Sequence, residues 1–238
     1  MFRSKLTLTL IALLSVLFFT RLGFWQLERA EQKQALRAAV QSRTELPPLV
    51  LHDLLSNHEE LRFRKVLARG TFDPEQQILL DNRTYQGRAG YHVVTPLRLS
   101  ASGIRVLVNR GWVELGRSRA ELPVVPPPQG EVAIHGIIEI PSIPPNIFGM
   151  LSQPGPAWGN RWPYLDLDYF QARTDAILQP FLILQDPSDP GGLVRVWSQL
   201  KIRHEVHIGY AIQWFAFAAM VLVIYLRTTL RYAEPERR

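Results

Sequence analysis

The side chains best suited to chemistry gather where an uncharged apolar stretch begins, in the run His207-Ile-Gly-Tyr210-Ala-Ile-Gln213-Trp214. On a helix, one face of this run would carry the imidazole nearest the water and aromatic and small residues deeper. That face consists of His207, Tyr210, Ala211, Trp214 and Ala218. A neutral imidazole there could ligate the iron of a flat apolar macrocycle, with Ala leaving room for the ring. The alternative is that His207 is an interfacial residue on a membrane helix whose small residues pack against another helix.

Two Asn-Arg pairs are the other polar motifs that stand out. Asn82-Arg83 and Asn109-Arg110 each end an apolar run. Asn tolerates turn conformations and Arg can bond carbonyls or a carboxylate such as Asp81, so one interpretation is structural. The other is that the two guanidinium groups present forks to carboxylates, for example heme propionates.

Enzyme motifs are not found in the sequence. It contains no Gly-x-Ser-x-Gly, no phosphate-binding Gly-x-x-x-x-Gly-Lys and no Gly-x-Gly-x-x-Gly. His204 and His207 stand at i and i+3, whereas a zinc-protease helix needs i and i+4. The chain has no Cys and only 3 Met, which excludes thiol chemistry and Cys-ligated metals and disfavours a copper chaperone. The remaining histidines are scattered: His52, His58, His92 and His135.

Two stretches are long enough to cross a membrane, although the mean hydropathy of the chain is only −0.03. Residues 6–24 carry Arg21 as their one charge, and residues 208–226 carry none. At 1.5 Å per residue, each can span a hydrocarbon core of about 30 Å. Gln213 is a polar group within the second stretch and is therefore predicted to mark an intramembrane contact.

The first stretch is interpreted as an uncleaved anchor, with a secretory signal peptide as the alternative. Phe18, Phe19, Phe24 and Trp25 occupy the positions where cleavage needs small residues. Trp25 would lie at the interface, which Arg21 can also reach. The basic tails of residues 1–5 and 227–238 then predict that both ends are cytoplasmic and that residues 25–207 lie outside.

The segment between the two stretches is almost uncharged overall. Residues 25–207 hold 20 basic and 19 acidic residues, so most of the net charge of +6 lies at the membrane ends. Nucleic-acid binding is therefore not expected of this segment. Its 183 residues are enough for one domain with a hydrophobic core.

The central segment begins as a helix and continues as β-structure. Helix formers in residues 26–43 predict that the first apolar helix extends outward, until Pro47-Pro48 breaks it. Short β-type runs separated by turn-rich segments follow, at residues 63–68, 77–80, 91–97, 104–108, 132–139 and 181–184. One helix is expected near residues 168–177, capped by Asp166 or Asp168.

These elements define the expected fold class. Because no helical pattern separates most of the neighbouring strands, we expect a mainly antiparallel sheet closed into a small barrel or sandwich. The chain is thus predicted to be an α+β membrane protein in which two transmembrane helices flank an extracytoplasmic β domain. Residues 141–163, with Phe148, Trp158 and Trp162, are predicted to form a long ordered loop tied to that domain, or else a partner-binding surface.

Four longer motifs occur along the chain. They are LGFWQLER at residues 22–29, NRTYQGRAGYHVVTPL at 82–97, VLVNRGW at 106–112 and HIGYAIQWF at 207–215. Together they resemble the surfeit-locus family of cytochrome oxidase assembly proteins, in the order and two-span arrangement of that family. The resemblance extends from Leu22 to Tyr225.

This resemblance implies a non-enzymatic assembly factor for cytochrome c oxidase that assists heme a delivery to the large subunit. His207 matches the heme-iron ligand proposed for the family. Tyr210 and Trp214 could flank the ring, and an interfacial aromatic belt would explain these two residues equally well. The family often has Asn two residues before this His, where the present chain has Glu205. The implied partners are the large oxidase subunit, heme a synthase as a second candidate, and membrane lipid, with no nucleic acid.

The implied location is the cytoplasmic (inner) membrane, with a periplasmic domain. Two other functions stay open. One is a heme-independent clamp that holds an oxidase subunit during assembly, and the other is a membrane-anchored enzyme or sensor, which would need several titratable residues to converge in the external domain.

Overall fold

The computed structural model describes residues 2–116, 121–146, 151–197 and 205–231. The chain divides into two compact units, a helical unit of Met1–Ala39 with Ser198–Arg238 and a β unit of Val40–Trp197. The helical unit contains most of the first helix and the whole of the last, and the β unit contains the strands.

The helical unit consists of α1 (Phe2–Thr44) and α4 (Glu205–Arg231). Both helices are long and apolar enough to cross a membrane, with mean hydropathies of 1.9 and 1.8 in their most apolar parts. Those parts are only 6% and 11% buried within the protein, as expected for helices that face lipid. α1 runs without a break to Thr44, which confirms the prediction that the helix extends to about residue 43.

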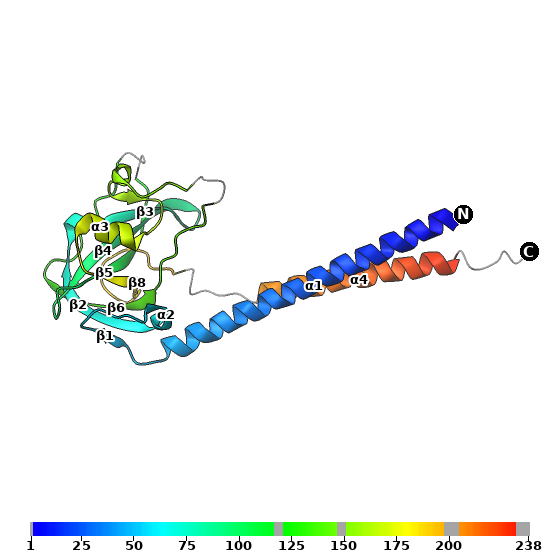
Figure 1. Cartoon of the computed structure of the whole chain (residues 1–238), viewed down its shortest axis with the longest axis horizontal. Coiled ribbons are helices and arrows are strands. Elements are labelled where there is room, and N and C mark those ends of the chain that lie inside the picture. The colour runs from blue at the N-terminus through cyan, green and yellow to red at the C-terminus, as the bar shows by residue number, and fades with distance from the viewer. Residues whose placement is uncertain (1, 117–120, 147–150, 198–204, 232–238) are drawn as a thin grey trace, which may run out of the picture. The chain divides into compact units, whose positions relative to one another are not determined.

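α1 and α4 run antiparallel and side by side (Figure 1). Residues with reduced exposure recur at intervals of four and three along both helices. The rows with this spacing include Ala12, Val16, Phe19, Gly23, Gln26 and Ala30 on α1, and His207, Ala211, Trp214, Ala218, Val221 and Tyr225 on α4. We call these two rows the seam. A seven-residue repeat of this kind keeps one stripe of each helix against its neighbour over many turns.

The β unit is built around a closed ring of five strands. They are β2 (Lys65–Phe72), β4 (Arg88–Leu99), β5 (Arg105–Glu114), β8 (Leu178–Gln185) and β6 (Glu131–Glu139), named in order around the ring. The antiparallel β2–β4 pairing closes the ring, with Thr71 opposite Arg98. The β5–β8 pair is parallel, and the other ring pairs are antiparallel. The closed barrel leaves none of these five strands with an unpaired edge.

Shorter elements extend or cover this barrel (Figure 1). β1 (Leu49–Leu51) pairs with β2, β3 (Ile78–Tyr85) pairs with β4, and β7 (Arg161–Trp162) pairs with β3. The short helices are α2 (His58–Leu61), α3 (Leu167–Thr174) and the 3₁₀ turns η1 (Pro74–Gln76) and η3 (Pro156–Trp158). The Asp166 carboxylate accepts a 2.9 Å hydrogen bond from the Tyr169 amide, which confirms Asp166 as the cap of the predicted helix.

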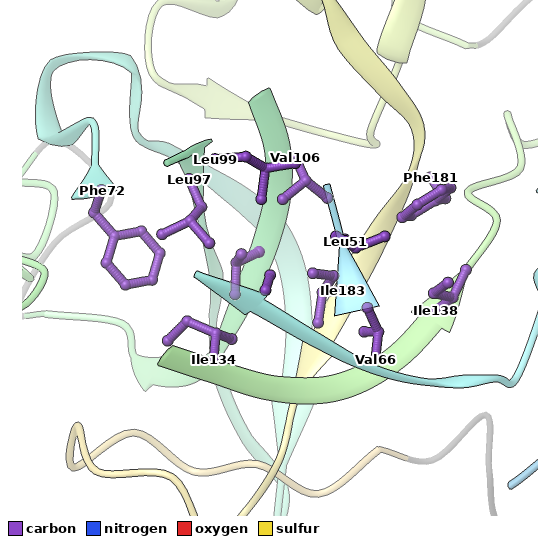
Figure 2. Packing of buried hydrophobic residues seen from close by; sticks show 12 residues of the cluster. Leu51, Val66, Phe72, Leu97, Leu99, Val106, Ile134, Ile138, Phe181 and Ile183 are labelled. Carbon is purple, nitrogen blue, oxygen red and sulfur yellow. The ribbon is translucent and has the colours of Figure 1, made fainter. Parts of the chain in front are cut away.

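Alternating apolar residues fill the interior of the barrel. On β2 the buried positions include Val66, Ala68 and Phe72, and exposed or half-buried residues lie between them. These side chains meet those of the other strands in one cluster, shown in Figure 2. The cluster contains Leu51, Val66, Ala68, Phe72, Leu97, Leu99, Val106, Val108, Ile134, Ile138, Phe181 and Ile183. Period-two alternation therefore sets both the barrel core and the register of its strands.

The predicted strands are all found, and each extends beyond a predicted end, two of them through an Asn-Arg pair. Asn82-Arg83 and Asn109-Arg110 lie inside β3 and β5 and do not end them. A bulge between Leu80 and Arg83, where Asn82 has φ +56°, and a second one at Arg110 let each strand continue past the polar pair. The predicted α+β class with a mainly antiparallel barrel agrees with this architecture.

The proline- and aromatic-rich loop packs on its own domain. Trp158 and Trp162 are 7% and 0% exposed, and their ring centroids lie 5.3 Å apart. Tyr164 adds an edge contact to Trp158 at 4.9 Å and donates to the Ser152 carbonyl. Phe148 lies outside the described residues. The described part of the loop is thus ordered by aromatic packing, and its role as a partner-binding surface stays a prediction.

Close approach of β6 to β8 at Gly136 generates a stability prediction. A methyl group on Gly136 would lie 2.4 Å from both the Leu184 carbonyl oxygen and Cγ2 of Ile183. We expect Gly136→Ala to lower the free energy of unfolding by about 1–3 kcal/mol, because the strands must separate to admit it. Gly155→Ala is the matched control, since a methyl group there would meet nothing within 4 Å. Equal thermal stability of the two variants, measured in detergent by circular dichroism, would contradict the packing of β6 on β8.

Candidate functional site

His207 lies in the first turn of α4 and is fixed by a hydrogen bond across the seam. Its Nδ1–H donates to Oε1 of Gln26 on α1 over 2.9 Å, in a half-buried position. Because Gln26 directly follows the apolar part of α1 and His207 precedes that of α4, the antiparallel helices bring the two polar groups to the same level. An ion pair between Arg37 and Glu205, 3.0 Å apart, connects the same two helices close by.

This hydrogen bond determines which imidazole nitrogen is left for chemistry. A neutral imidazole that donates from Nδ1 carries its lone pair on Nε2. Histidines that bind metal commonly donate their other ring N–H to a carbonyl or carboxylate, which fixes the ring and raises its basicity. His207 could therefore ligate a metal through Nε2, with Gln26 holding the ring in place.

The aromatic residues near His207 have different environments. Trp214 is part of the seam and stacks on Phe19 of α1, with ring centroids 5.8 Å apart and planes inclined by 18°. Phe217 packs against both rings. Tyr210, in contrast, is 49% exposed and lies outside the seam. The predicted shared face of α4 therefore holds for His207 and Trp214, and Tyr210 lies beside it.

The space beside the small residues of that face is occupied by α1. Ala211 and Ala218 are only 1% and 8% exposed. At Gly23, a side chain would lie 2.6 Å from the Phe215 ring. Small residues let two membrane helices approach closely, and this is the role they have here. The space predicted for a macrocycle over the Ala residues is therefore occupied. On this face of α4, only His207 at its end could act as a ligand.

Two other sequence predictions meet different outcomes. Gln213 has an exposed side chain, and its predicted intramembrane contact stays a prediction. Within the described residues, no three His, Cys, Asp or Glu side chains group as a metal site. His58 contacts the Ser56 carbonyl and His135 contacts Asp189, while His204 lies outside the described residues.

The motif around Asn109-Arg110 is a structural hub of the barrel. The Arg110 guanidinium donates to the carbonyls of Val125 and Pro126 and to Oε1 of Gln77, over 2.9 to 3.1 Å. Its own carbonyl accepts a 2.7 Å hydrogen bond from Nε of buried Arg195. Arg110 thus ties neighbouring segments to β5, which confirms the structural interpretation for this pair.

The Asn82-Arg83 pair differs because the Arg83 side chain is not satisfied in the same way. Arg83 is half-buried, and its Nε is buried with no hydrogen-bond partner in the described part of the chain. Burial lowers the pKa of the Arg83 guanidinium. The Arg83 carbonyl, in contrast, accepts a 3.0 Å hydrogen bond from the Trp112 indole.

His92 on β4 lies near Arg83 and is held neutral. Nδ2 of Asn109 donates to Nδ1 of His92 over 3.2 Å, and the Trp197 ring packs edge-on against the imidazole at 5.6 Å. Burial and, secondly, the charge of Arg83 lower the pKa of His92 to about 4. The sequence did not reveal these surroundings of His92, because only the β3–β4–β5 register brings Arg83 and Asn109 to it.

The low pKa of His92 generates a prediction about acid stability. The unfolded chain protonates this His near pH 6.5 and the folded chain only near pH 4, so the unfolded state binds more protons between these values. Stability should therefore fall by roughly 2 kcal/mol between pH 7 and pH 5 through this group alone. In His92→Gln this part of the pH dependence should vanish when thermal unfolding in detergent is compared at the two pH values. An identical pH dependence in both proteins would contradict the neutral buried state of His92.

Comparison with known proteins covers nearly the whole chain. A family model described as "SURF1 family" matches residues 13–219. Surfeit locus protein 1 of Rattus norvegicus is 29% identical over 231 residues, which cover 88% of this chain and 72% of the rat protein. The human Surfeit locus protein 1 is 27% identical over 232 residues, covering 88% of this chain and 73% of its own.

A bacterial relative matches over a similar extent. The SURF1-like protein of Rickettsia felis is 27% identical over 224 residues, covering 91% of this chain and 94% of its own. The matched range includes Gln26, Arg83 and His207. The chain belongs to the SURF1 family.

Proposed function

We propose that this protein is an assembly factor for cytochrome c oxidase that holds heme a at His207 and passes it to the large oxidase subunit. The observation that carries the proposal is the Gln26–His207 hydrogen bond, which selects the tautomer of the imidazole that has its lone pair on Nε2. Membership of the SURF1 family supports an assembly role over an enzymatic one. His207 would hold heme a, and the cofactor, when bound, would supply an iron that an imidazole can ligate.

The protein's own residues then have defined roles. Gln26 holds the His207 ring in one tautomer and one orientation, which lowers the reorganisation needed for ligation. Trp214 and Phe19 pack the seam below the imidazole and exclude water from it. One protein ligand gives weaker retention than two, which suits a carrier that must release its cargo.

The proposed setting is the cytoplasmic membrane. Two candidate spanning helices support a membrane protein, and the basic tails favour cytoplasmic termini with a periplasmic barrel. In that setting His207 would lie at the outer membrane interface, level with a membrane-embedded recipient. The large oxidase subunit is the proposed recipient, heme a synthase a candidate donor, and lipid the surrounding medium, with no role for nucleic acid.

A heme-independent clamp is the second candidate function. The observation in its favour is that α1 covers Ala211 and Ala218, which closes the part of the face expected to receive a macrocycle. In this alternative the protein would hold an oxidase subunit during assembly, and His207 would serve only the helix pair.

Complementation of a deletion strain separates the two functions. We expect His207→Ala to be present in membranes at normal level, to carry no heme after purification, and to lower oxidase-bound heme a at least several-fold. Gln26→Leu should weaken heme retention by about 10- to 100-fold, the range typical of residues that orient a metal ligand. His58→Ala is the matched control, because that imidazole bonds only locally on the β unit.

Heme spectra and oxidase activity, measured in the same membranes, distinguish the outcomes. Full oxidase activity in His207→Ala, with the variant purified free of heme, would favour the clamp. Heme retention by His207→Ala at the level of His58→Ala would remove His207 as the ligand.

A further inference from the structure

One face of the β3–β4–β5 sheet brings Arg83 and His92 together beside aromatic rings. Arg83 on β3 pairs with Gly90 on β4, and His92 lies two residues further along β4 and pairs with Trp112 on β5. Paired residues, and residues two apart on a strand, point to the same side of a sheet, so Arg83, His92 and Trp112 share a face. The bulge at Asn82 brings Arg83 to this side of the sheet. We infer that Arg83 and His92 form a binding subsite for the carboxylate of a flat organic acid.

The missing side chain at Gly90 shapes this subsite. A Cβ atom there would lie 2.5 Å from the Trp112 ring, so the indole lies directly over the Gly90 backbone. Tyr85 then contacts the same indole, with ring centroids 5.4 Å apart. Trp112 is itself only 8% exposed, so the half-buried Tyr85 ring is the aromatic surface beside the guanidinium. Such a surface suits a ligand that combines a planar apolar body with an acid group.

The charge of Arg83 calls for an anion. No ion pair joins Arg83 to a carboxylate among the described residues, and the internal segments outside them, 117–120, 147–150 and 198–204, contain no Asp or Glu. A half-buried cation without a counter-charge is costly, and Arg110 on β5 shows how this fold satisfies one that is structural. Arg83 lacks such acceptors at its buried Nε.

His92 supplies the second donor. Since Asn109 donates to Nδ1, the neutral ring carries its proton on Nε2. A guanidinium and an imidazole N–H on neighbouring positions of one sheet face match the two oxygens of a carboxylate. Both groups are held by the sheet register and by Asn109, so little ordering is needed on binding.

The proposed function enters this inference only in the choice of probe, a metal-free porphyrin dicarboxylate. The full chain, purified from cells that make no heme a and placed in lipid nanodiscs, is titrated with mesoporphyrin and with its dimethyl ester, using porphyrin fluorescence anisotropy. Nanodiscs without protein give the lipid baseline. Wild type should bind the diacid at least 10-fold more tightly than the diester.

Variants then test whether Arg83 causes the preference for the diacid. Arg83→Gln should abolish the 10-fold discrimination and Arg83→Lys should retain part of it. Arg88→Gln, which removes a cation already paired with Glu114 at the surface, should keep the full preference. No preference in wild type, or an unchanged preference in Arg83→Gln, would overturn the inference. Because the probe has no iron, His207→Ala should bind it like wild type, so failure here and failure of the heme proposal are distinguishable.

Thermal unfolding tests whether Arg83 has a purely structural role. If Arg83 is kept for binding, Arg83→Gln should unfold at the wild-type temperature or above it, since a cation without a counter-charge is removed. A lower unfolding temperature together with lost discrimination would mean that Arg83 supports the fold, and would overturn the inference.

Discussion

Hydrocarbon offers no hydrogen-bond partners, so the polar groups of two apolar helices must find each other across the helix pair. The seven-residue repeat of α1 and α4 determines which polar residues can meet, because only residues at the repeating positions of each helix lie in the seam. Gln26 with His207, at the end of the apolar stretches, and Thr9 with Tyr225, within them, are two pairs formed across the seam. Each such bond contributes about 0.6–2 kcal/mol to helix association, and the first also selects the tautomer of the imidazole.

The β unit applies the same rule to its buried cations. Arg195 is 7% exposed and donates to the carbonyls of Arg110, Asp186, Asp189 and Pro190. Arg110 in turn donates to the 125–126 segment. These two side chains join loops to the barrel through several charge-assisted hydrogen bonds. Arg83 differs from these two, because it is a half-buried cation with no ion pair among the described residues and with a buried Nε that has no acceptor.

Local patterns were sufficient to predict the helices, the position of each ring strand and the Asp166 cap, because periodicity and capping act over a few residues. The closing β2–β4 pair and the parallel β5–β8 pair join distant segments, and no local pattern encodes them. The two bulges were mistaken for strand ends because Asn favours turn conformations, and only pairing with the neighbouring strand shows that β3 and β5 continue. Gln26 was visible in the first long motif, but its role depends on the antiparallel register of the two helices. Tyr210 lies only about 60° from the seam on a helical wheel, and packing alone decides that it is exposed.

The most direct test of the account is the ionisation and tautomer of His207, read from the ¹⁵N shifts of selectively labelled histidine in the full chain at pH 7, with His207→Ala used to assign the signals. The hydrogen bond to Gln26 predicts that the neutral ring carries its proton on Nδ1 and leaves Nε2 unprotonated. In Gln26→Leu this preference should disappear. A His207 that is protonated on Nε2, or charged, in the wild-type protein would leave no lone pair where the account needs one and would contradict it.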